Sequence, residues 1–210
     1  SWNVQVASSA FLDGILYRIK SKGIGPAGEE TSTDIEADKV DFYVDRTRPE
    51  SAITPYPESG GYYNTILTIS GTAQDMDPDG TGPAVAGKID RVRLFIRKQG
   101  TNQYYNGSAW QTGAYDIPVG TYNATQVNWQ WTVTYPTECW KDDGTYEIYS
   151  KSYDQSEIGG NEELNPEVDL ITVIIDNTPP SSGLLFPNKE IHNSIPIVSG
   201  TAQDSSLRPP

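Results

Sequence analysis

Hydrophobic and polar residues alternate along several short stretches of the chain, and the alternation has the period of β-strands. Residues 91–97 (RVRLFIR) place three aliphatic side chains on one face and three arginines on the other. Residues 127–135 (VNWQWTVTY) alternate in the same way, with Trp129 and Trp131 on the apolar face. A helix would scatter these side chains around its surface, whereas a half-buried strand sorts them by face. We therefore expect two strands here and a core that contains both tryptophans.

The remaining apolar stretches extend this β pattern. Short runs predict strands at residues 67–73, 146–153 and 170–175. The segment Tyr104–Trp110 (YYNGSAW) predicts a hairpin, since Asn-Gly supplies the positive φ angles of a type I′ turn. Glycine and proline interrupt every stretch that has a helical period. About seven strands in roughly 130 residues, separated by turns, predict an antiparallel β-sandwich.

Four blocks of sequence occur twice, in the same order and at nearly the same spacing. SWNVQV resembles QWTVTY, DGILYRIKSK resembles DGTYEIYSK, VDRTRPES resembles IDNTPPSS, and ISGTAQD resembles VSGTAQD, at offsets of 129 to 131 residues. A repeat of about 130 residues therefore divides the chain into the back half of one repeat (1–45), a complete repeat (46–176) and the opening strands of a third (177–210). Proline in both linkers favours an extended rod.

Composition and charge narrow the range of partners and activities. The chain has 15 basic and 28 acidic residues and a net charge of −13, whereas nucleic acids and anionic membranes attract basic patches. No apolar run of about 18 residues is present, so we expect no membrane insertion in this segment. The single cysteine, Cys139, is expected to be a small buried residue. Because no positioned nucleophile, phosphate-binding loop or cofactor motif is present, we expect no enzymatic activity. The acidic balance suits a protein in an extracellular or cell-surface location.

Taken together, these motifs resemble the bacterial immunoglobulin-like repeats that occur in tandem in large surface proteins and adhesins. The resemblance rests on ISGTAQD, the YYNGSAW hairpin, the Trp-rich strand, DGTYEIYSKSYD and VIIDNTPP. It implies an immunoglobulin-like sandwich with a structural, spacing function, in which each repeat contacts its neighbours along the chain. Asp143-Gly-Thr-Tyr146 resembles the start of strand F with its tyrosine corner. The loop after Asp154 is longer than in such repeats, so the resemblance does not assign Asn161 as a metal ligand.

The same resemblance predicts where metal ligands would gather. Asp45 in the linker, Asp75 after strand B and Asp154 after strand F are expected to converge at one pole, where carboxylates from separate loops suit Ca²⁺. Asp75, Asp77 and Asp79 also fit the D-x-D-x-D-G opening of a calcium loop, although an EF-hand is excluded because its acidic twelfth position is missing. An ordinary acidic turn explains Asp77 and Asp79 equally well.

A carbohydrate-binding module is the alternative function. Tyr104, Tyr105 and Trp110 lie near the predicted hairpin, and their rings could form a platform on which a sugar stacks. The same rings could instead cover the edge of the sandwich.

The partial repeats leave two interpretations open. Neither residues 1–45 nor residues 177–210 can close a sandwich or hide its strand edges. Either the sequence is a window of a longer chain, or the partial repeats of neighbouring copies complement each other in a homopolymeric filament. Such a composite would lack the strands equivalent to residues 88–124, which favours the window. An intact subunit of 23.1 kDa would support the composite, and a much larger one the window.

Overall fold

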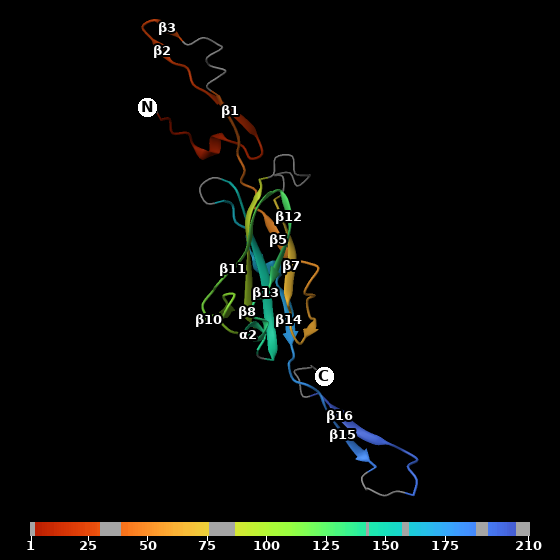
Figure 1. Ribbon diagram of the computed structural model, residues 1–210. Coiled ribbons are helices and arrows are strands. Elements are labelled where there is room, and N and C mark those ends of the chain that lie inside the picture. The colour runs from red at the N-terminus through yellow and green to blue at the C-terminus, as the bar shows by residue number, and fades with distance from the viewer. Residues whose placement is uncertain are drawn as a thin grey trace.

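The computed structural model of the chain (Figure 1) describes residues 3–29, 39–75, 87–141, 143–156, 160–187 and 193–204. Strands dominate these residues, and nearly all of them pair in antiparallel sheets. Among the described residues the helical elements are one turn of α-helix, α2 (Pro136–Cys139), and two 3-10 turns, η1 (Ser8–Ala10) and η2 (Pro166–Asp169). The predicted all-β class is therefore confirmed.

Two sheets form the central block of the molecule. Its strands are β5 (Glu50–Ile53), β6 (Tyr62–Tyr63), β7 (Thr68–Gln74), β8 (Ile89–Lys98), β9 (Gln103–Tyr105), β10 (Trp110–Thr112), β11 (Ile117–Ala124), β12 (Gln126–Thr132), β13 (Gly144–Asp154) and β14 (Ile171–Ile175). The smaller sheet has the order β12–β7–β5, and the larger has the order β10–β9–β8–β13–β14–β6, with β11 also paired to β8. Among these strands β6 runs parallel to β14, and the other pairs are antiparallel.

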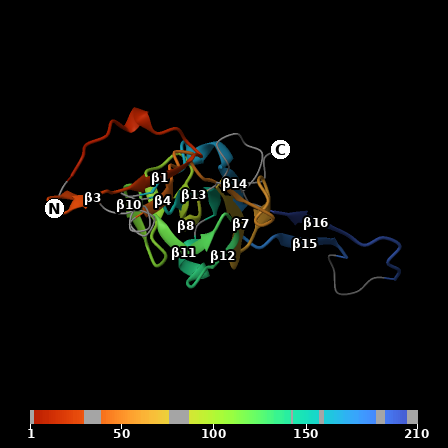
Figure 2. The same cartoon turned by 90° about the horizontal axis from the view of Figure 1, so that it is seen from above.

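The apolar faces of the two sheets enclose the core. Val92, Leu94 and Ile96 of β8 are fully buried, which matches the face predicted from the alternation. Trp129 of β12 is buried as predicted, while Trp131 packs at the margin of the core as a partly buried ring. Seen from above, β7 and β12 lie beside β8 and β13 as a separate layer (Figure 2). Each buried aliphatic side chain contributes about 1.5–3 kcal/mol, so this core is the main source of stability of the block.

The Trp-rich strand is shorter than its alternation predicts. β12 ends at Thr132, whereas the pattern continues to residue 135. The chain then turns into α2, which begins at Pro136, because proline suits the first turn of a helix and restricts the residue before it. This turn carries Trp140 into the core, where its indole N–H donates to the carbonyl of Ile66 (2.7 Å).

The predicted hairpin is present, but its turn is of a different kind. Tyr105 lies opposite Trp110, and the backbone N–H of Asn106 donates to the carbonyl of Ala109 (3.0 Å), so the turn centres on Gly107 and Ser108 and the predicted Asn-Gly type I′ turn is excluded. The side-chain carbonyl of Asn106 accepts hydrogen bonds from two backbone N–H groups of the loop (2.8 and 2.9 Å). The positive φ of the loop belongs to Gly107, and Asn106 closes the loop through its side chain instead.

A two-stranded pair stands at each end of the central block (Figure 1). The pairs are formed by β1 (Leu16–Lys20) with β4 (Lys39–Tyr43) and by β15 (Ser181–Phe186) with β16 (Ser199–Gln203). A short hairpin of β2 (Ile24–Gly25) and β3 (Gly28–Glu29) follows β1. Both views show β15 and β16 projecting beyond the block.

The N-terminal pair has the register of β13 and β14. Leu16 lies opposite Tyr43, and the residues 129 and 131 positions later, Thr145 and Ile174, also lie opposite each other. A helical turn precedes the first strand in both places, η1 before β1 and α2 before β13.

The C-terminal pair has the register of β5 and β7 in the same way. Ser181 lies opposite Gln203, and their counterparts Glu50 and Gln74 are paired as well. The two SGTAQD segments are thus strands of equivalent pairing.

The end pairs differ from the block in their burial. Ile69 and Ile148 are fully buried in the block, whereas Val198 and Ile19, at the equivalent positions, are 66% and 48% exposed. In the described part of the chain no second sheet packs on β1–β4 or β15–β16, so their apolar faces stay in contact with water.

Candidate metal centre

Three of the aspartates predicted to gather at one pole lie together. Asp45 stands in the linker after β4, Asp75 follows β7, and Asp154 ends β13. One carboxylate oxygen from each lies within 4.8 Å of the other two. Because oxygen ligands surround Ca²⁺ at about 2.3–2.6 Å, two ligands of one ion can lie up to about 5 Å apart. Asp77 and Asp79 lie outside the described residues.

These carboxylates are shielded from water. Asp75 is 3% exposed and Asp154 is 1% exposed, while Asp45 is half-buried. Oδ2 of Asp45 is itself buried and has no well-formed hydrogen bond among the described residues. Gathering three carboxylates away from water is costly unless a cation or bound protons neutralise them. The donor set consists of hard oxygens, which suit Ca²⁺ better than a soft metal.

Gly87 leaves the space in which the carboxylates meet. A β-carbon at this position would lie 2.2 Å from Oδ2 of Asp45 and 2.4 Å from Oδ2 of Asp75. Both distances are far below van der Waals contact, so any other residue would push the two carboxylates away. Sequence analysis did not identify Gly87 as part of the site. The missing side chain of Gly87 is what lets the Asp45 and Asp75 carboxylates approach the backbone at this point.

Asn161 orients the residues around the same site. Its side-chain amide donates to Oδ2 of Asp154 (2.8 Å) and to the backbone carbonyl of Asp45 (3.2 Å). The backbone N–H of Asn161 donates to the other carboxylate oxygen of Asp154 (2.7 Å). Such outer contacts fix the direction of a metal-binding carboxylate. Asn161 is therefore a positioning residue, and it also joins the linker to the end of β13.

The carboxyl group of Asp45 has a raised pKa. Burial raises the pKa of its carboxyl group from 3.8 to about 6, and the nearby charges of Asp154 and Asp13 act in the same direction. The backbone N–H groups of Thr47 and Gly87 act in the opposite direction. Calcium binds the ionised carboxylate, so a proton and a cation compete for this group near pH 6.

A second aspartate holds the start of each linker. Asp13 accepts a hydrogen bond from the backbone N–H of Arg46 (2.8 Å), and Asp143 accepts one from Asn177 (2.6 Å). The threonine that follows in each linker donates its hydroxyl to the same aspartate. Both linkers therefore leave the preceding strand pair through the same arrangement of hydrogen bonds.

Comparison with known proteins assigns no family. A scan against protein-family models finds no match, and a search of curated proteins finds no similar sequence. The link to immunoglobulin-like repeats therefore rests on the motifs and stays a hypothesis.

The aromatic residues considered for sugar stacking are largely covered. Tyr105 is fully buried and Tyr104 is 6% exposed. Trp110 is half-buried, and its indole N–H donates to the carbonyl of Glu138 (3.1 Å). A sugar platform requires exposed ring faces, and these three rings do not present one together. Tyr105 and Trp110 extend the core at the β9–β10 end of the larger sheet, while Tyr104 packs against Arg97 on the other face.

Neither the single cysteine nor any described helix adds a reactive or membrane-spanning feature. Cys139 is fully buried, and burial raises the pKa of its thiol, so the thiol stays protonated and unreactive. In the described residues no helix is long and apolar enough to cross a membrane.

Proposed function

We propose that this chain is a structural segment of an extracellular or cell-surface protein built from tandem immunoglobulin-like β-sandwiches. Residues 46–176 then form one complete repeat, residues 1–45 the end of the preceding repeat, and residues 177–210 the beginning of the next. The strand order supports this proposal: β5–β7–β12 corresponds to strands A, B and E of an immunoglobulin sandwich, and β8–β13–β14 corresponds to C, F and G.

The end pairs support the tandem arrangement through their packing as well as their register. The rings of Phe11 and Tyr17 meet edge to face, with centroids 4.8 Å apart at 85°. The equivalent rings, Trp140 and Tyr146, meet at 5.3 Å and 90°. An aromatic pair of this geometry contributes about 0.5–1.5 kcal/mol beyond the area that it buries. The same contact at an offset of 129 residues is expected of two copies of one structural unit.

The position of Asp45 carries the functional proposal. This residue belongs to the linker, yet its carboxylate lies within 4.8 Å of Asp75 and Asp154, which belong to the central sandwich. A calcium ion held by all three would attach the linker to the ends of two strands. Because this attachment removes bending at the joint, the segment would act mechanically, as a stiff spacer between neighbouring repeats.

Direct contacts add to the stiffness of this joint. Arg48 in the linker donates to the backbone carbonyl of Glu162 (2.9 Å), and Asn161 donates to the carbonyl of Asp45. The loop after β13 therefore packs along the linker, and the partners proposed here are the neighbouring repeats of the same chain.

Calorimetric titration tests the calcium site directly. CaCl₂ added to calcium-depleted protein at pH 7.5 is expected to saturate a site containing Asp154, and Mg²⁺ to bind it more weakly, because Mg²⁺ demands shorter, octahedral coordination. Asp154→Asn is expected to weaken Ca²⁺ binding at least about tenfold, since it removes one charged ligand. Asp169→Asn, which changes an exposed carboxylate in η2, is the matched control. Equal affinity in the protein and in Asp154→Asn, or no binding heat at all, would contradict the site.

A further inference from the structure

The loop after β13 folds back and pairs with the end of β13, at the edge of the larger sheet. β14 pairs with β13 only as far as Ile148. Beyond that point the loop takes its place: Glu162 bridges to Tyr153, and the backbone N–H of Glu163 donates to the carbonyl of Ser152 (3.0 Å). Successive residues of an extended segment point to opposite faces, so Glu163 enters the interior while Glu162 lies on the outer face.

Glu163 fixes the loop to both sheets. Its carboxylate is 5% exposed and accepts hydrogen bonds from the hydroxyls of Ser51 on β5 (2.6 Å) and Ser152 on β13 (3.0 Å). The backbone N–H of Ser152 donates to the same oxygen (2.9 Å). A buried carboxylate with these donors is expensive to withdraw, so the loop is held in one position. The surface that the loop builds is therefore preformed.

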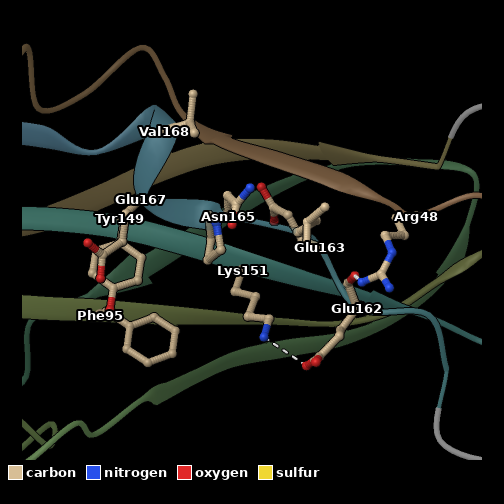
Figure 3. A pocket seen from close by; sticks show the side chains of 11 residues that line it. Arg48, Phe95, Tyr149, Lys151, Glu162, Glu163, Asn165, Glu167 and Val168 are labelled. Atoms are coloured by element: carbon tan, nitrogen blue, oxygen red, sulfur yellow. Dashed lines mark hydrogen bonds and ion pairs between the residues drawn. The ribbon is translucent and has the colours of Figure 1, made fainter.

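The loop and the outer face of the larger sheet border an open, shallow pocket of about 610 Å³ (Figure 3). Phe95 of β8 lies opposite Tyr149 of β13, and their rings stack in parallel at 4.6 Å and 4°. Tyr149 is buried, whereas Phe95 is partly exposed and lines the pocket. The stacking packs the Phe95 ring against Tyr149 and so presents it as a flat apolar surface at the pocket.

Polar groups stand beside this ring. The ammonium group of Lys151 contacts the carboxylate of Glu162 (2.7 Å), as the dashed line in Figure 3 marks. Arg48 donates to the backbone carbonyl of Glu162 (2.9 Å) and lines the same pocket. The Glu162 side chain is 53% exposed, so its carboxylate remains accessible to a ligand. Donors and acceptors are thus held together next to a flat apolar ring.

We propose that this pocket binds a neutral sugar residue, whose apolar face stacks on Phe95 while its hydroxyls bond to Glu162 and Lys151. A pyranose needs an aromatic face together with adjacent donors and acceptors, and this pocket supplies both. The pocket volume falls within the range of roughly 300–1,000 Å³ that is usual for ligand sites. Arg48 and Lys151 offset two of the three carboxylates that line the pocket, Glu162, Glu163 and Glu167. The net charge of −13 also opposes anionic glycans. This inference requires the fold but not the calcium site.

A printed array of neutral oligosaccharides (gluco-, xylo-, manno- and galacto-oligomers of three to six units) is the first test. The unmodified protein is expected to bind at least one of these series, and the bound oligomer is then titrated by calorimetry. Phe95→Leu, which removes the flat ring but keeps an apolar side chain, is expected to weaken binding about tenfold. Glu162→Gln, which keeps the shape but removes the charge, is expected to weaken it as well. Tyr115→Ala, at an exposed ring outside the pocket, is the control and should bind unchanged.

The two pocket variants distinguish loss of sugar binding from loss of stability. Weaker binding by Glu162→Gln at an unchanged melting temperature supports the pocket even where Phe95→Leu proves less stable. Binding of no neutral series, binding of anionic glycans alone, or full affinity in both pocket variants overturns the proposal.

Discussion

At the scale of single residues, Gly87 and Asn161 determine whether three aspartates can act as one site. Gly87 leaves room for the oxygens of Asp45 and Asp75, and Asn161 holds Asp154 in position. The aspartates themselves are predictable from sequence, because each follows an apolar strand or ends a repeat. Gly87 is not predictable, since its role arises only when segments distant in sequence come together. The resemblance drew attention to Asn161 but left its role unassigned because of the longer loop, and its hydrogen bonds to Asp154 and Asp45 appear only in the fold.

Gly87→Ala is expected to weaken calcium binding at least about tenfold although every ligand is retained. The added β-carbon would lie 2.2 Å from the Asp45 oxygen, so both facing carboxylates must move apart. Calorimetric titration with CaCl₂ measures the effect. Gly144→Ala, where a β-carbon meets nothing within 4 Å, is the control and should bind as the parent does. An unchanged affinity in Gly87→Ala would remove Gly87 from the site.

Calcium affinity is also expected to fall with pH through a window set by Asp45. Its pKa is raised from 3.8 to about 6, so in the calcium-free protein its contribution to stability is complete below pH about 4 and is lost as the pH rises through 6. Calcium requires the ionised form, so binding at pH 5 should be about tenfold weaker than at pH 7.5. Titrations at both pH values, repeated with Asp45→Asn, measure this difference. A pH dependence equally steep in Asp45→Asn would assign the proton to another group.

At the scale of elements, strands were predictable and their partners were not. The alternation around β8 identified its buried face, because period two leaves only one apolar side. The alternation around β12 predicted too long a strand, because hydrophobic alternation carries no information about Pro136, which begins α2. The edge segment next to β13 was not predicted. The polar run that contains Glu162 and Glu163 has no alternating pattern, and it is extended only because it pairs with β13.

Gly71, in the first SGTAQD segment, accounts for part of that repeated motif. A β-carbon there would lie 2.2 Å from the carbonyl of Ala52 and from the ring of Trp129. Gly71→Ala is therefore expected to destabilise the protein by about 1–3 kcal/mol through overpacking. Urea unfolding measures the change, with Gly144→Ala as a control that should stay within about 0.5 kcal/mol. A Gly71→Ala variant as stable as this control would show that the strands can separate without cost.

At the scale of the whole molecule, the two linkers share the same local hydrogen bonds. Asp45 and Asp176 occupy equivalent positions, and each accepts a hydrogen bond from the backbone N–H of the threonine two residues later. Asp45 lies with Asp75 and Asp154, whereas Asp176 lines one cavity with Asp204, the residue 129 positions after Asp75. The sequence indicated this organisation through its offsets, whereas the closeness of the linker to the sandwich required the structure.

Thermal unfolding with and without calcium, compared between Asp45→Asn and Asp176→Asn, shows whether a calcium ion locks the joint at Asp45. At about 100 times its Kd, calcium should stabilise the unmodified protein by about 2.7 kcal/mol, because it binds the folded state alone. Asp176→Asn is expected to keep this rise in Tm, and Asp45→Asn is expected to lose most of it. A Tm indifferent to calcium, or an equal rise in both variants, would contradict a calcium-locked joint.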